Sequence, residues 1–182
     1  MINNIKDRFP VFKKKPNLVF LDTAASALKV DKMINAITEC YSFEYANIHR
    51  GIYELSSKLT KKYEDSRVVV SNFINSPSPD NIVFTKSATE GINLVASCLS
   101  KNYLKDKDEI LVSKLEHHAN LVPWHLISKK IKIIAGEIDN KGELNYDDLI
   151  AKITSKTKLI AITHMSNVTG SITSFEKIKT KA

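Results

Sequence analysis

The second half of the chain alternates apolar segments of strand length with segments of helical periodicity, and this alternation constrains the fold most. The apolar segments are 81–86, 109–114, 131–139 and 158–164. The helical segments between them are 89–104, 119–127 and 146–153. Apolar strands that alternate with helices usually pair in parallel, with helices covering the faces of the sheet. The sequence therefore predicts an α/β fold with a parallel sheet.

The first half of the chain is predicted to be helical. Segments 30–46 and 57–74 place apolar residues at helical spacing, and the proline-containing stretch after residue 74 ends the second helix. We therefore divide the chain into an N-terminal segment, a helical segment and a sheet-containing domain, with the bounds 1–28, 29–76 and 77–182.

Composition and cysteine usage predict an ordinary cytoplasmic protein. Hydrophobic residues make up 43% of the chain and charged residues 26%. The apolar runs are far shorter than the roughly 20 residues that cross a bilayer, and the first residues lack the apolar stretch of a secretory signal. The two cysteines, Cys40 and Cys98, are far apart and form no CxxC pattern. We expect reduced thiols and no membrane association.

The formal charge of +7 raises nucleic-acid binding as an alternative function. The lysines are scattered, however, and the densest cluster is Lys13–Lys15, with no aromatic residues interleaved. A solvated surface explains such a distribution, because net charge bears on solubility more than on function. We expect no nucleic-acid partner.

The predicted strand at 81–86 leads directly into the start of a helix. Ser87 and Thr89 bring hydroxyl groups there, beside backbone N–H groups that have no intrahelical acceptor. A helix start of this kind is a natural anion site, since its N–H groups and its dipole both favour negative charge. An ordinary helix cap is the alternative interpretation.

Three histidines follow the second predicted strand, in "KLEHHANLVPWHL". His117 and His118 are adjacent, so in an extended segment their side chains point to opposite sides and do not readily hold one metal ion. His125 lies beyond a proline. We expect no metal site, and favour a single imidazole lining a cleft, with a structural histidine as the alternative.

Polar residues also follow the fourth predicted strand, in "THMSNVTGS". Thr163, His164, Ser166 and Asn167 are expected at the rim of the sheet, where parallel α/β folds bind their ligands. Asn167 either donates to a ligand oxygen or holds the loop as an Asx turn. The segment "NIHRGIYELS" further upstream suits an anionic substrate or a partner subunit, or is a solvated loop.

Five blocks together carry a specific resemblance: "FLDTAASALKV", "YANIHRGIYELS", "VFTKSATEGINLVA", "LEHHANLVPWHL" and "AITHMSNVTGS". In this order and spacing they resemble the N-terminal part of the group II, SUF-type cysteine desulfurases, a branch of the class V aminotransferases. The resemblance runs from about Asp7 to the end of the chain. It implies a fold-type I enzyme that uses pyridoxal 5'-phosphate (PLP). Such enzymes are homodimers that transfer sulfur from L-cysteine, through a persulfide, to a sulfur-acceptor protein for iron–sulfur cluster assembly.

The resemblance also implies roles for individual residues. Thr89, with Ala88 beside it, matches the phosphate-binding helix start, His117 matches the histidine that stacks on the pyridine ring, and Asn167 matches a residue near the phenolic oxygen. His49 and Arg50 match an active-site loop near the substrate and the dimer interface, and Ala25 and Ser26 match the N-terminal turn on the substrate side.

Some positions differ from the family pattern. Ala88 replaces a common threonine, Lys86 a common arginine and Tyr53 a common histidine. Members of the family run to about twice this length, and the Schiff-base lysine, the aspartate at the pyridine nitrogen and the nucleophilic cysteine have no match in this chain. We therefore expect a chain that is inactive alone. The alternatives are a non-catalytic module that binds PLP or a partner, and a fragment of another class V enzyme.

The resemblance implies strands 1–4 of a seven-stranded sheet of order 3-2-4-5-6-7-1. Strand 4 would then be an exposed edge, and the helix after strand 1 would lose its usual packing support. The partners that follow are a second copy of the chain or a complementing C-terminal half.

Overall fold

The computed structural model describes residues 5–127 and 130–179 of the chain. The chain forms two compact units, Met1–Val83 and Phe84–Ala182. Within the described ranges, no helix combines the length and the apolar character that a membrane span requires.

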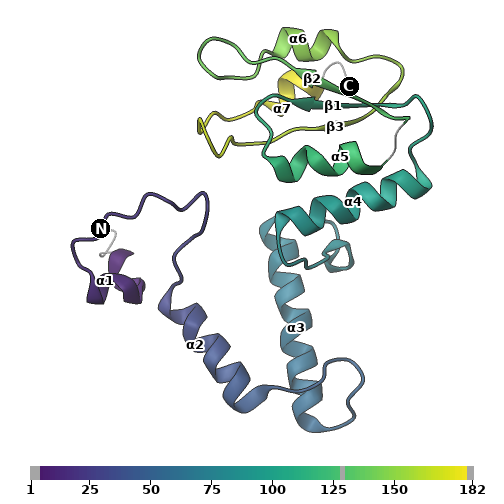
Figure 1. Cartoon of the computed structure of the whole chain (residues 1–182). Coiled ribbons are helices and arrows are strands. Elements are labelled where there is room, and N and C mark those ends of the chain that lie inside the picture. The colour runs from purple at the N-terminus through teal and green to yellow at the C-terminus, as the bar shows by residue number, and fades with distance from the viewer. Residues whose placement is uncertain (1–4, 128–129, 180–182) are drawn as a thin grey trace. The chain divides into compact units, whose positions relative to one another are not determined.

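The first unit is helical (Figure 1). Its elements are η1 (Ile5–Arg8), α1 (Pro10–Lys14), α2 (Asp31–Glu39), the π-helical turn η2 (Cys40–Glu44), α3 (Glu54–Phe73) and η3 (Pro79–Asn81). The two predicted helices are confirmed, although α3 begins at Glu54 rather than at Ser57. Glu54 extends it by placing a carboxylate in the first turn, where it pairs with Lys58 at 2.5 Å.

Apolar side chains of the first unit are largely exposed. The expected apolar face of α2 contains Met33, Ile34 and Ile37, which are 43%, 40% and 47% exposed. Among the described residues of this unit, Ile82 is the one buried hydrophobic side chain, at 7% exposure. Because most helix stability in proteins comes from tertiary packing, these helices gain little from the apolar surface that the unit itself buries.

The second unit contains a parallel three-stranded sheet with the order β2-β1-β3. The strands are β1 (Glu109–Ser113), β2 (Lys132–Gly136) and β3 (Thr157–Ala161). β1 is central and buried along its whole length, in agreement with the consecutive apolar residues Ile110, Leu111 and Val112 at its centre. This arrangement confirms the parallel α/β fold and the expected order of these three strands.

Helices cover both faces of the sheet (Figure 1). They are α4 (Ala88–Asn102), η4 (His118–Asn120), α5 (Val122–Ile127), α6 (Tyr146–Ala151) and α7 (Phe175–Lys179). Ile110 and Val112 pack in a cluster with Ala96 and Trp124. Leu111 points to the opposite face and packs with a second cluster, which includes Leu149 and Ile178. The alternation of side chains along β1 therefore divides the core into two layers.

The strand predicted at 81–86 is absent. Residues 82–85 adopt no regular secondary structure, and neither β2 nor β3 pairs with this segment. Val83 is 68% exposed and Phe84 is 43% exposed. A strand forms only where its backbone can hydrogen-bond to a neighbouring strand. This segment has the apolar composition of a strand, but within the described residues no strand edge lies beside it.

The expectation that the helix after this segment loses its packing is wrong for its inner face. Ala96 in α4 is 1% exposed and belongs to the core, with Ile92 and Leu99 packed against the same cluster. The outer face agrees with the expectation, since Leu94 and Val95 are 46% and 49% exposed. α4 therefore has one packed face and one open face.

Candidate functional site

Two adjoining cavities lie in the second unit, near the carboxyl ends of β1 and β3 and the start of α4. The larger has a volume of about 430 Å³, within the range typical of small-molecule sites. Its lining comprises Ala88, Ile92, Glu116, His117, Ala119, Asn120, Ile160, Ala161, Ile162 and Thr163. The smaller, of about 290 Å³, is lined by Thr89, Asn93, His117, His118, Ala119, Val122 and Pro123. His117 and Ala119 line both cavities.

The start of α4 is capped in a way that leaves two backbone donors open. Ser87 Oγ accepts a 3.2 Å hydrogen bond from the N–H of Glu90, and the Glu90 carboxylate accepts from the N–H of Lys86. Within the described residues, the N–H groups of Ala88 and Thr89 have no acceptor. The cap and the anion site are therefore compatible, since they use different N–H groups.

His117 is held by its own turn. Its Nδ1 accepts a 3.1 Å hydrogen bond from the N–H of Ala119, so the proton of the neutral ring lies on Nε2. The rings of His117 and His118 lie edge to face with centroids 6.2 Å apart, so the expectation that the two side chains point apart is wrong. The reason is that the chain leaves the extended conformation at His118, where η4 begins.

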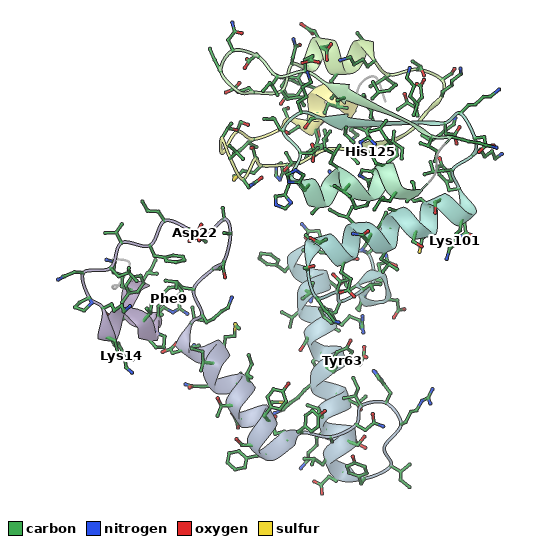
Figure 2. All side chains as sticks on the ribbon, in the orientation of Figure 1. Phe9, Lys14, Asp22, Tyr63, Lys101 and His125 are labelled. Atoms are coloured by element: carbon green, nitrogen blue, oxygen red, sulfur yellow. The ribbon has the colours of Figure 1, made fainter. Side chains whose placement is uncertain are left out.

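The third histidine of this stretch does not join the other two. His125 is exposed on α5 (Figure 2) and lines neither cavity. Among the residues that the structure describes, no three His, Cys, Asp or Glu side chains are grouped as metal ligands.

The segment after β3 contributes fewer polar side chains to the cavities than its sequence predicts. Of its polar residues, only Thr163 is among those that line the larger cavity. The ring of His164 packs instead against Phe175, with centroids 5.4 Å apart. Asn167 is exposed and lines neither cavity. It lies in a turn held by Ser166, whose buried Oγ accepts 3.2 Å hydrogen bonds from the N–H groups of Val168 and Thr169.

Glu116 is the residue that sequence reasoning missed. Its carboxylate accepts hydrogen bonds from Ser113 Oγ at 2.5 Å, from the N–H of Thr163 at 2.9 Å and from Asn120 Nδ2 at 2.7 Å. The sequence showed a carboxylate directly before two histidines. It did not show that residue 163 returns to the same place.

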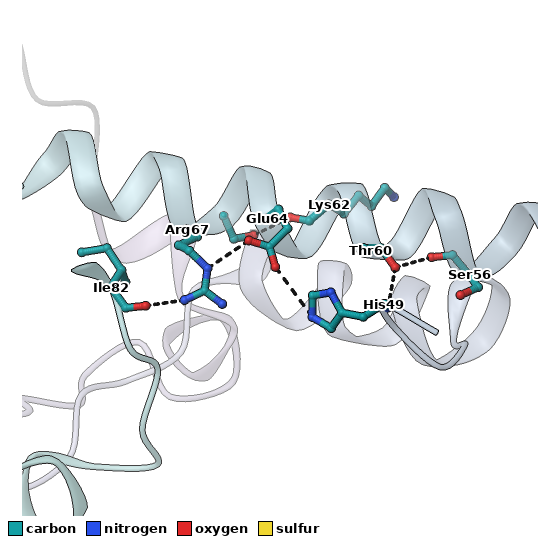
Figure 3. Close-up of polar contacts among 8 residues, drawn as sticks. His49, Ser56, Thr60, Lys62, Glu64, Arg67 and Ile82 are labelled. Carbon is teal, nitrogen blue, oxygen red and sulfur yellow. Dashed lines mark hydrogen bonds and ion pairs between the residues drawn. The ribbon is translucent and has the colours of Figure 1, made fainter. Parts of the chain in front are cut away.

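His49 and Arg50 lie in the first unit, in the loop that precedes α3. His49 has a positive φ of 69°, and its N–H donates to Thr60 Oγ1 at 2.9 Å. Its Nε2 is 3.7 Å from the Glu64 carboxylate, as Figure 3 shows. Arg50 is exposed, and its N–H donates to the carbonyl of Ile48 at 2.9 Å. His49 thus connects the loop to α3 through Thr60 and Glu64.

Gly51 packs closely against the first turn of α3, and Arg67 connects α3 to the end of the unit. A Cβ on Gly51 would lie 2.2 Å from Oγ of the fully buried Ser56, so a larger residue here would displace the Ser56 side chain. Arg67 links α3 to the end of the unit through the Glu64 carboxylate and the carbonyl of Ile82 (Figure 3). The hydrogen bond to Glu64 raises the pKa of Arg67.

Ala25 and Ser26 also belong to the first unit. Their N–H groups donate to the carbonyl of Asp22 at 3.2 and 3.1 Å, which closes a turn, and both residues are exposed. Their expected role on the substrate side stays a prediction, as does that of His49 and Arg50.

The chain is similar to known cysteine desulfurases over nearly its whole length. It is 40% identical to a probable cysteine desulfurase of Mycolicibacterium paratuberculosis, over 96% of this chain and 26% of the relative. It is 38% identical to the cysteine desulfurase SufS of Plasmodium falciparum, over 96% of this chain and 33% of the relative. The apo structure of a cysteine desulfurase from Thermococcus onnurineus superposes with a TM-score of 0.86 at 33% identity, over 98% of this chain and 44% of that chain.

The chain thus spans less than half the length of each of these proteins. The sequence pattern of the family described as Aminotransferase class-V matches residues 19–182. The match includes the start of α4, the turn formed by His117 and η4, and β3, which together surround the two cavities. The chain therefore belongs to the class-V aminotransferase family.

Proposed function

We propose that this chain forms the phosphate- and ring-binding part of a PLP-dependent cysteine desulfurase. The carrying observation is that the open helix start at Thr89 and the imidazole of His117 line one cavity. PLP is the cofactor of the family, and its phosphate and aromatic ring require an anion site and a flat side chain close together. The residues present fit both requirements.

Each residue would act through chemistry that its surroundings already favour. The N–H groups of Ala88 and Thr89 and the hydroxyl of Thr89 would donate to the phosphate oxygens. The ring of His117 would stack on the pyridine face, and the apolar side chains of Ile92, Ile160 and Ile162 would exclude water from one side. When bound, PLP supplies an electron sink for bond cleavage at the amino acid.

The reaction we assign is the desulfuration of L-cysteine. The Cβ–S bond of the substrate breaks, and an S–S bond forms to a cysteine thiol of the enzyme. The products are L-alanine and an enzyme persulfide, so the atoms and electrons balance without an external oxidant. Among the described residues that line the two cavities, none is lysine or cysteine. We propose that a complementing polypeptide supplies the Schiff-base lysine and the thiol.

The finer assignment is to the group II, SUF-type branch, with iron–sulfur cluster assembly as the purpose of the sulfur. It rests on "HRGIYELS" and "EHHANLVPW". The partners that we propose are a second copy of the chain, the complementing half and a sulfur-acceptor protein. A cytoplasmic location fits the two free cysteines.

The cofactor part of the proposal is tested with pyridoxamine 5'-phosphate, which cannot form a Schiff base with surface lysines. Calorimetric titration of the chain should give saturable binding. The substitution Thr89→Val should weaken it roughly ten- to hundredfold, since one charge-assisted hydrogen bond to the phosphate is lost. Thr38→Val, the same change on exposed α2, should leave the affinity unchanged. Equal effects of both substitutions contradict a phosphate site at α4.

The catalytic part is tested by complementation. The chain is mixed with a polypeptide that covers the remaining part of a homologous cysteine desulfurase, and association is checked by gel filtration. We expect sulfide and alanine to form from L-cysteine only in the mixture. A stable complex that binds the cofactor and releases no sulfide contradicts the assignment.

A further inference from the structure

The carboxylate of Glu116 joins three separate segments of the second unit. Oε1 accepts from Ser113 Oγ, at the end of β1, and from the N–H of Thr163, after β3. Oε2 accepts from Asn120 Nδ2, in η4. All three donors are uncharged, so the carboxylate forms charge-assisted hydrogen bonds with them rather than ion pairs.

Two of these contacts lie in the lining of the larger cavity, because Glu116, Asn120 and Thr163 all line it. Glu116, His117 and Asn120 come from the segment after β1, and 160–163 come from the end of β3 and the residues after it. The hydrogen bond from Thr163 to Glu116 therefore joins the part of the lining that contains the imidazole to the part that β3 provides. We propose that Glu116 is a positioning residue that holds these two parts of the lining together and fixes the place of the His117 ring.

The connection from Glu116 to the ring passes through η4. The N–H of Asn120 donates to the carbonyl of His117 at 2.8 Å, while Ala119 donates to His117 Nδ1 at 3.1 Å. The same Asn120 is held from its side chain by Glu116. Release of that side chain frees the turn whose backbone orients the imidazole.

The orientation of the Asn120 amide is determined by its two partners. Its Oδ1 accepts a 3.2 Å hydrogen bond from Nε1 of Trp124, which has a donor and no acceptor. Its Nδ2 faces Glu116, which as a carboxylate has acceptors and no donor. Trp124 is 3% exposed and packed in the core, so it anchors this chain of hydrogen bonds.

This arrangement predicts a specific pattern of variants. In Glu116→Gln the N–H₂ group of the new side chain faces the N–H₂ group of Asn120, so two donors meet. Rotating the Asn120 amide does not remove the conflict, because its N–H₂ group would then face the N–H donor of Trp124. In Asn120→Asp two carboxylates face each other. In the double variant the glutamine donates to the aspartate, which still accepts from Trp124, while Ser113 and Thr163 keep their acceptor. Each single substitution should therefore be harmful, and the pair should be compensatory.

Two readouts separate positioning from stability. One is the affinity for pyridoxamine 5'-phosphate, which depends on the proposed function. The other is the pair of ¹⁵N chemical shifts of the His117 ring, which report its tautomer without any ligand. Urea unfolding of each variant gives the accompanying stability. Glu137→Gln is the matched control, because that carboxylate pairs with Lys114 and lines neither cavity.

We expect each single variant to bind pyridoxamine 5'-phosphate about tenfold more weakly than the unmodified chain and to shift the His117 ring signals. The double variant should recover most of the affinity and most of the original ring signals, and Glu137→Gln should change neither the affinity nor the ring signals. The proposal is overturned if the single variants leave the ring signals unchanged. It is also overturned if the changes in affinity and ring signals in the double variant equal the sum of those in the two single variants. If the unmodified chain binds no ligand, the cofactor site fails, and the ring signals still decide the role of Glu116.

Discussion

The backbone N–H of Thr163 donates to Oε1 of Glu116 over 2.9 Å, although 47 positions separate the two residues. The parallel pairing of β1 and β3 makes this possible, because Val112 lies opposite Ala161 and the carboxyl ends of both strands meet at one edge. The cavity next to this bond therefore depends on the register of the sheet.

Ring stacking by His117 is tested by His117→Asn, which removes the ring and keeps a side-chain acceptor for the N–H of Ala119. Affinity for pyridoxamine 5'-phosphate should fall roughly two- to tenfold, the contribution expected of an aromatic contact. His125→Asn, at an exposed position of α5, is the control and should bind as the unmodified chain does. Equal affinity of the two variants would remove the stacking role.

The cap of α4 is tested by Ser87→Ala. The N–H of Glu90 loses the hydroxyl that accepts its hydrogen bond, so the free energy of unfolding should fall by about 1 kcal/mol. Urea denaturation followed by circular dichroism measures the change. Ser97→Ala, at an exposed interior position of the same helix, should be neutral or slightly stabilising, since alanine is the better helix former. Similar losses at both positions would argue against the cap.

Asp148 should make the second unit sensitive to acid. Lys152, at 2.7 Å, and the N–H of Glu137, also at 2.7 Å, lower the pKa of this carboxyl below its ordinary value. A lowered pKa in the folded state stabilises the fold above the unfolded pKa of roughly 4, and this stabilisation is lost as the pH falls through the folded pKa.

The substitution Asp148→Asn should therefore cost about 1 kcal/mol at pH 7 and less at pH 3. The urea midpoints of the variant and of the unmodified chain, measured at several pH values, give the loss of stability at each pH. An asparagine variant whose stability falls with acid as steeply as that of the unmodified chain would show that other groups carry the effect.

Packing of α6 on β2 is tested by Gly136→Ala. The added Cβ would lie 2.5 Å from Cδ1 of Leu149, which is fully buried, so we expect a loss of about 1–3 kcal/mol. Gly91→Ala in α4 is the matched change. Its Cβ would meet only Thr85 Oγ1 at 3.4 Å, and the variant should gain up to about 1 kcal/mol from helix propensity. Unfolding curves of the two variants should therefore move in opposite directions.

Periodicity was sufficient to predict α2 to α6 and three of the strands, because β1, β2 and β3 are apolar and their partners lie within the chain. The short helices α1 and α7 were not predicted. The segment 81–86 has the same composition and forms no strand. Whether a segment becomes a strand depends on a neighbouring edge, and composition does not reveal that edge.

The site divides in the same way. Thr89 and His117 were predicted from a helix start and a family pattern, and the fold brings them to one cavity. Asn167 carried an equally clear signal and lies in an exposed turn outside both cavities. Local sequence indicates that a side chain is near a strand end, and the path of the following turn decides where it lies.

By itself, then, the sequence determined the helical periods, the central apolar strand and the capped start of α4, all of which depend on residues close together in the chain. The contact of Glu116 with Thr163 and the absence of a strand at 81–86 were decided by tertiary structure alone. The physical reason is common to both. Each depends on which strand edges and strand ends come together in space, and a carboxylate or an apolar run fits many such arrangements equally well.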